Sequence, residues 1–116
     1  MTSSLDTHYD HENDQRLHVV IMANGSTASV LLQGEADVGS LKQLRDALND
    51  GELNGARSVE VNAAGLSFCD VASMRELALF ARQARAQGRV VTTSGASQLL
   101  WKLARMMGVI DDLGLC

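Results

Sequence analysis

The sequence predicts a single mixed α/β domain, and three observations lead to this expectation. The chain has 116 residues, the length of one domain with one modest core. Near its beginning, two aliphatic and β-branched segments flank a tight-turn sequence, which indicates an antiparallel hairpin. Further on, strand-like segments alternate with amphipathic segments, as in parallel crossover units. We therefore expect a mixed four-stranded sheet, with the hairpin followed by parallel crossovers and with three or four helices packed on the sheet's faces.

The first 16 residues are predicted to be a flexible acidic tail, and the folded domain is predicted over residues 17–116. The tail segment has few large apolar side chains and no hydrophobic period, so burial cannot offset the entropy of ordering it. Four of its side chains are acidic and only Arg16 is basic, whereas acids and bases nearly balance in the rest of the chain. Because the cations form no cluster, a nucleic-acid partner is not expected.

Composition also bears on the location of the chain. No apolar run approaches the roughly 20 residues that cross a bilayer, and the N-terminus lacks the pattern of a signal peptide. We therefore expect no direct membrane insertion and a cytoplasmic location. Two cysteines, Cys69 and Cys116, are too few for a disulfide framework, so both are expected to be reduced.

The first half of the domain is predicted to contain the hairpin, a helix and a third strand. The hairpin strands span residues 17–22 and 27–33, and Asn24-Gly25 between them favours positive φ. A helix follows, capped by Asp37 or Ser40, because apolar residues recur at helical spacing at Leu41, Leu44, Ala47 and Leu48. Residues 51–55 form a connection, residues 58–62 a short strand, and residues 63–70 a loop.

The second half is predicted to contain two helices around a fourth strand. The longest helix begins at Asp70 and ends at Gly88, and its apolar face consists of Met74, Leu77, Ala78, Ala81 and Ala84. A strand at residues 89–92 leads to the last helix, whose inward residues are expected to be Leu99, Leu100, Leu103, Met106 and Met107. Trp101 lies off this stripe, either as an exposed contact or as a half-buried edge residue.

Several segments, taken in order, resemble the STAS domain of bacterial anti-sigma factor antagonists. Residues 34–37, Gly-Glu-Ala-Asp, are similar to the family's G-E-L-D, and residues 41–48 are similar to the helix that follows it. Residues 62–70 parallel the family's D-L-S-G-V-x-F-I-D, and residues 88–91 parallel the entry to its last core strand. The resemblance covers residues 17–113. It implies a small domain that binds a GHKL-type kinase-like anti-sigma factor, or a related regulator, and so controls sigma-dependent transcription.

The chain departs from the family where the kinase would switch it off. Members typically read D-S-S-G-L, and the second serine is the phosphoacceptor, whereas this chain reads Asp-Val-Ala-Ser-Met at residues 70–74. Ala72 has no hydroxyl and cannot be phosphorylated. Ser73 is a weak substitute, because one residue further along a helix points about 100° further round the axis, and a first-turn serine more often bonds to the backbone.

The resemblance places the partner-binding site at the ends of two strands. Its expected residues are Asp37, Asp70, Val71, Ala72, Ser73, Met74 and Arg75. Asp37 and Asp70 are equally expected as helix caps, and the two roles are compatible. Self-association as a homodimer stays open.

We expect neither catalysis, nor a cofactor, nor a metal site. Cys69 has no base beside it in the sequence and is expected to be a small buried hydrophobe. His8, His11 and Glu12 fall in the expected tail, without preformed ligand geometry. The alternative to an anti-sigma factor antagonist is a STAS subunit of a lipid-transport ABC complex or a stressosome-like scaffold, since these tolerate altered acceptor sites.

Overall fold

A five-stranded mixed sheet forms the centre of the protein, with its strands in the order β1-β2-β3-β4-β5. The computed structural model describes Thr7–Tyr9 and residues 16–116. The strands are β1 (Thr7–Tyr9), β2 (Leu17–Asn24), β3 (Thr27–Ala36), β4 (Ser58–Cys69) and β5 (Val90–Ser94). The hairpin β2–β3 is antiparallel and the pairs β3–β4 and β4–β5 are parallel. The predicted fold class is therefore confirmed.

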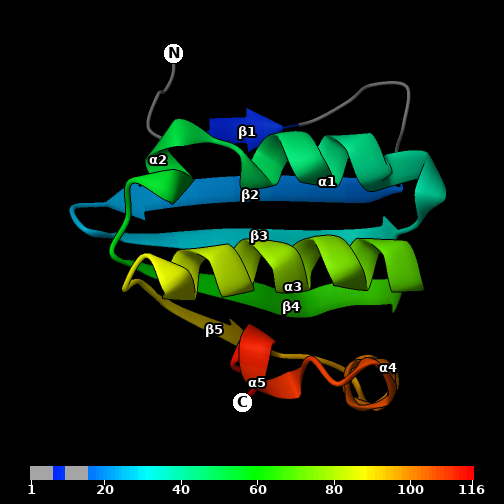
Figure 1. Cartoon of the computed structure of the whole chain (residues 1–116). Coiled ribbons are helices and arrows are strands. Elements are labelled where there is room, and N and C mark those ends of the chain that lie inside the picture. The colour runs from blue at the N-terminus through cyan, green and yellow to red at the C-terminus, as the bar shows by residue number, and fades with distance from the viewer. Residues whose placement is uncertain (1–6, 10–15) are drawn as a thin grey trace.

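The helices follow the predicted order, with short additions. They are the 3-10 helix η1 (Val38–Ser40), α1 (Leu41–Leu48), α2 (Gly51–Asn54), α3 (Val71–Ala86), α4 (Gln98–Met107) and α5 (Ile110–Leu113). The short helix α2 replaces the expected connection at residues 51–55, and the short helix α5 follows the last expected helix. Helices α1 and α3 lie side by side over one face of the sheet, whereas α4 and α5 lie beside its β5 edge (Figure 1).

The core lies between the sheet and helices α1 and α3, on one face of the sheet only. Alternate residues of β2 and β3 are buried there, because successive strand side chains point to opposite faces: Leu17, Val19, Ile21, Ala28, Val30 and Leu32. On the opposite face, residues such as Val20 and Leu31 stay partly exposed. The predicted apolar face of α3, from Met74 to Ala84, is buried throughout and completes the core.

Strand β1 was not predicted from the sequence. Its three residues pair antiparallel with residues 19–21 of β2, so the expectation of a tail does not hold at Thr7–Tyr9. Arg16 also belongs to the fold, because its guanidinium forms an ion pair of 2.7 Å with Asp37. The remainder of the expected tail, residues 1–6 and 10–15, lies outside the described residues.

The predicted loop at residues 63–70 is wrong, because these residues continue β4 as far as Cys69. The two-residue alternation stops at Ala63, and the next buried residues are Leu66 and Cys69, at intervals of three. Two register shifts against β3 accommodate the extra residues, and shifts of this kind remove the period that identifies a strand in a sequence.

Cys69 ends β4 with its thiol in the core. Burial, together with the nearby carboxylate of Asp70, raises the pKa of this thiol to about 12. Cys116, in contrast, is exposed at the C-terminus. Cys69 is thus a buried apolar side chain, as expected, and it stays protonated at neutral pH.

Gly34 allows the end of β3 to approach the start of β2. Its φ is +99°, and an added Cβ would overlap the carbonyl oxygen of Arg16. Replacing Gly34 with alanine should therefore destabilise the fold by about 3 kcal/mol or more, through backbone strain and overlap. Gly25→Ala is the matched control, because Gly25 also has positive φ but open space around it, and should cost about 1–2 kcal/mol. Equal losses in urea unfolding would show that the close approach is not a constraint.

The two cysteines should differ in reactivity. In the folded protein at pH 8, a thiol reagent should modify one cysteine per chain, Cys116, and in denaturant it should modify both. In Cys116→Ser, the folded protein should not react. Because the thiol of Cys69 ionises at a higher pH in the folded chain than in the unfolded chain, stability should fall as pH rises from about 9 towards 12. Rapid modification of Cys69 at pH 8 would contradict its burial.

Candidate functional site

The expected site residues meet where β3 and β4 end. Ala36 pairs with Cys69 in the parallel ladder, so the residues that follow, Asp37 and Asp70, lie at the same edge of the sheet. The backbone amide of Asp70 also donates to the carbonyl of Ala36, at 3.0 Å. Binding sites of α/β proteins characteristically lie at the carboxyl ends of parallel strands.

Asp37 and Asp70 both cap helices. The Asp37 carboxylate accepts a hydrogen bond from the amide of Gly39 at 2.9 Å, and Ser40 reciprocates by accepting from the Asp37 amide at 3.1 Å. Of the two expected caps, Asp37 therefore serves η1, whereas Ser40 makes no side-chain cap for α1. The Asp70 carboxylate accepts from the amide of Ser73 at 2.8 Å and begins α3, as predicted.

The first turn of α3 divides the remaining expected residues into two groups. Val71 is 45% exposed, Ala72 is half-buried and Arg75 is exposed. Ser73 and Met74 point inward, with Ser73 0% exposed, so their assignment to a partner-binding surface is wrong for the folded protein. The offset round the helix that separates Ser73 from Ala72 is what directs its hydroxyl into the core.

The Ser73 hydroxyl is buried and finds no hydrogen-bond partner among the described residues. A kinase could reach this oxygen only if α3 moved away from the sheet. Ser67, in contrast, is exposed on β4, where its hydroxyl donates to the carbonyl of Gly34 at 3.0 Å. The hydroxyl nearest to Ala72 in the sequence is therefore inaccessible.

Exposed apolar side chains next to this turn were missed in the sequence. Phe68, near the end of β4, is 48% exposed. On α4, the prediction that Leu99 and Met106 face inward is wrong: they are 70% and 77% exposed, and only Leu100 and Ala104 of this helix are buried. Their helical spacing indicates that the helix has an apolar face. Spacing alone does not show whether that face packs in the core or lies at the surface. Trp101 is half-buried.

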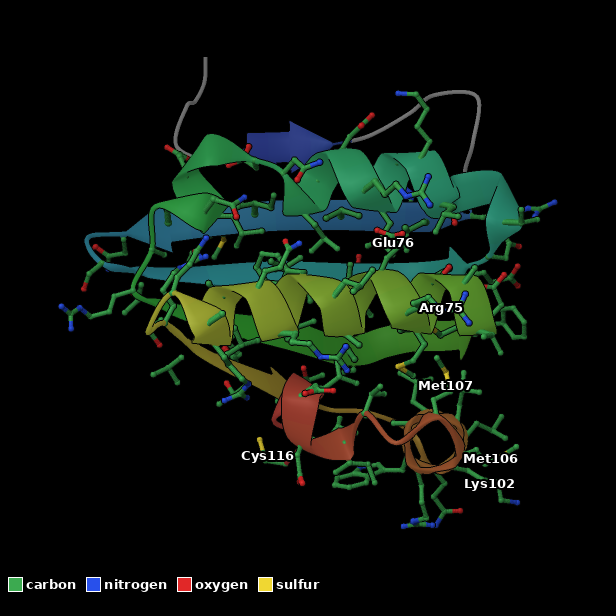
Figure 2. All side chains as sticks on the ribbon, viewed as in Figure 1. Arg75, Glu76, Lys102, Met106, Met107 and Cys116 are labelled. Carbon is green, nitrogen blue, oxygen red and sulfur yellow. The ribbon has the colours of Figure 1, made fainter. Side chains whose placement is uncertain are left out.

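Two hollows lie beside these apolar residues. A hollow of about 400 Å³ lies between α3 and α4, lined by Val71, Arg75, Ala78, Leu79, Arg82, Met107 and Val109. A second, of about 190 Å³, lies between the end of β4 and α4, lined by Ser67, Phe68, Cys69, Leu99, Leu100 and Leu103. Figure 2 shows Met107 reaching from α4 towards Arg75 on α3, with Met106 and Lys102 on the outer side of α4.

Within residues 7–9 and 16–116, no group of histidine, cysteine and acidic side chains has the arrangement of a metal site. In the sequence, three residues are candidates for metal ligands. Of these, His11 and Glu12 lie outside the described residues, and only the backbone of His8 is described. Over the same ranges, none of the helices combines the length and apolar character that a bilayer span requires.

Comparison with solved structures finds the same fold in regulatory and transport proteins. An anti-sigma factor antagonist from Mycobacterium paratuberculosis shares 11% identity, over 85% of this chain and 84% of that one, with a TM-score of 0.76. The phosphorylated form of the Bacillus cell fate determinant SpoIIAA shares 18% identity, over 84% and 90%, with a TM-score of 0.66. A sulfate transporter family protein from Wolinella succinogenes shares 19% identity, over 80% and 75%, with a TM-score of 0.64.

Comparison with curated protein sequences finds no match. A family model, described as "Mlab, STAS domain", matches residues 19–115. The match begins at Val19 in β2 and ends at Leu115, so it includes the residues at which β3 and β4 end. The chain belongs to the STAS domain family.

Proposed function

We propose that the chain is a bacterial, cytoplasmic regulator of the anti-sigma factor antagonist type. It binds a GHKL-type kinase-like anti-sigma factor, or a related regulatory protein, and so controls sigma-dependent transcription. The observation that carries the proposal is the first turn of α3, where Val71 and Arg75 are exposed and Ala72 is half-buried, beside the ends of β3 and β4. The fold that the chain shares with anti-sigma factor antagonists supports the same reading.

The proposed activity is binding, not catalysis. Asp37 and Asp70 use their carboxylates to cap η1 and α3, and Asp37 is also ion-paired with Arg16. Cys69 is protonated in the core, so it is no nucleophile at neutral pH. These roles leave the edge of the sheet with a rigid backbone and a small, largely uncharged surface at residues 71–72, which suits contact with another protein.

Regulation in this protein does not use phosphorylation at position 72. Ala72 offers no hydroxyl, and the neighbouring Ser73 hydroxyl points from α3 into the core. The surface that the partner contacts therefore keeps the same charge whether or not a kinase is active. We propose that the antagonist is controlled through its amount or through its partner.

The alternative function is that of a STAS subunit in a lipid-transport ABC complex, or of a stressosome-like scaffold. A protein of the sulfate transporter family shares the fold, and this supports a membrane complex as the alternative. The two functions differ in the partner that each requires. Co-purification of the tagged full-length chain from its native cells tests them: a GHKL-type regulator supports our proposal, and a membrane permease would replace it with the alternative.

Ala72→Glu should weaken binding of the co-purified regulator by a hundredfold or more, while the fold is kept. A carboxylate in the first turn interacts favourably with the helix dipole, by about 0.3–1 kcal/mol. A docked partner, however, must desolvate that charge or leave it unpaired, which costs several kcal/mol. Calorimetric titration and thermal melts separate the two effects, and Glu60→Ala, at an exposed strand position, serves as a control. Unchanged affinity in a folded Ala72→Glu would place the interface elsewhere.

Incubation with the co-purified kinase and ATP should leave the segment from Ala63 to Arg75 unmodified. Ala72→Ser should accept phosphate there, because position 72 is half-exposed and a phosphate at a helix N-terminus is well accommodated. Peptide mass spectrometry of both proteins provides the measurement. Stoichiometric phosphate on Ser67 or Ser73 of the unmutated chain would show that the acceptor has moved.

A further inference from the structure

We propose that the outer side of α4 and the hollows beside it bind an amphipathic helix of the partner whose polar residues are acidic. This inference rests on the proposed function, because it names the chemistry of the partner that the exposed turn of α3 contacts. It adds a second surface, which we call the α4 strip, made of Leu99, Leu103, Met106 and Met107.

The α4 strip runs continuously from the core to solvent. Leu100 and Ala104 attach α4 to the domain, Leu103 and Met107 are partly buried beside them, and Leu99 and Met106 are mostly exposed. Residues three and four apart are neighbours on a helix, so the four strip residues form one apolar side. Packing within the described residues therefore uses only part of the apolar surface of α4, and the exposed part is available to a partner.

The two hollows lie against different residues of the α4 strip. Met107 lines the hollow between α3 and α4, and Leu103, one helical turn earlier, lines the hollow beside Phe68. A helix that lies in a groove inserts apolar side chains at i, i+3 or i+4 and i+7 into successive depressions of this kind. The concave, divided shape fits such a helix better than it fits a flat bilayer surface.

Unpaired cations surround the α4 strip. Arg75 on α3 and Lys102 and Arg105 on α4 are exposed, and none of them forms an ion pair within the described part of the chain. Two of the nearby acids are engaged, because Asp70 caps α3 and Asp112 binds Arg82 at 2.6 Å. Two others are exposed, Asp111 after α4 and Glu35 opposite Phe68 in the β3–β4 register, so the three cations outnumber them.

This excess of positive charge identifies the occupant. A second copy of the chain would bring the same cations face to face across a two-fold axis, because both subunits present the same patch there. A partner helix with carboxylates at its polar edge would instead pair with them, and such complementary charges set which partner is accepted.

A pair of synthetic helical peptides tests the inference without knowledge of the natural partner. Each peptide has about 18 residues, or five turns, with leucine at i, i+3, i+4 and i+7. One carries glutamate at the polar edge and its twin carries lysine. The glutamate peptide should bind the isotope-labelled full chain about tenfold more tightly than the lysine peptide at low salt, and high salt should remove the difference. Amide shifts should concentrate at Val71, Leu99 and Met106.

Surface variants locate the binding. Leu99→Ser combined with Met106→Ser should abolish binding of the glutamate peptide with little effect on the melting temperature, because both side chains are mostly exposed. Met22→Ser, at an exposed methionine of β2, is the matched control and should bind normally. Arg75→Glu combined with Lys102→Glu should reverse the preference in favour of the lysine peptide.

Four results would overturn the inference: equal affinity for the two peptides, no binding of either, a dimer of the free chain that Met106→Ser dissociates, or the same amide shifts with vesicles of anionic phospholipid but not with peptide. The proposed function is judged separately, by the effect of Ala72→Glu on the co-purified regulator. If Ala72→Glu weakens that complex and the Leu99/Met106 double variant does not, the proposed function stands and the α4 strip is excluded.

Discussion

The parallel pairing of β3 with β4 is the constraint on which the site depends. Residues 36 and 69 stand opposite each other at the end of this ladder, although 33 positions separate them in the chain. Their successors, Asp37 and Asp70, each begin a helix at the same edge, and each uses its carboxylate to bind a backbone amide. Two hydrogen bonds therefore fix the start of α3: the Asp70 amide donates to the Ala36 carbonyl, and the Asp70 carboxylate accepts from the Ser73 amide. The exposed turn is thus a preformed surface.

The same constraint fixes the different surroundings of positions 72 and 73. On a helix capped at Asp70, position 72 faces partly outward and position 73 faces the core, because the rotation between them is fixed at about 100°. A hydroxyl cannot be exchanged between these positions without turning the helix, and turning it would expose Met74 and Leu77, which fill the core. The buried Ser73 hydroxyl therefore cannot take the place of a hydroxyl at position 72.

Helix α4 packs on the domain through one part of its apolar side and exposes the other part. Leu100 and Ala104 are buried, and Leu103 and Met107 pack partly against the core. Gly108, with φ of +72°, ends the helix so that Val109 and Leu113 return to the core. Arg82 and Arg85 then hold α5 through Asp112. The exposed residues of the α4 strip take no part in these interactions, so they can be substituted with little loss of stability.

The sequence by itself determined the class of the fold, the hairpin, the three long helices and the cap at Asp70. These features depend on local patterns: the two-residue period, the helical period, the Asn-Gly turn and the N-cap preference, all of which act between close neighbours in the chain. Only the tertiary structure decided that residues 63–69 continue β4, because the register shifts that restore their burial depend on β3. Tertiary packing also decided that Ser73 faces inward while Leu99 and Met106 face outward. An apolar period shows that a helix has an apolar side, but which part of that side is covered depends on how the helix is placed against the rest of the molecule.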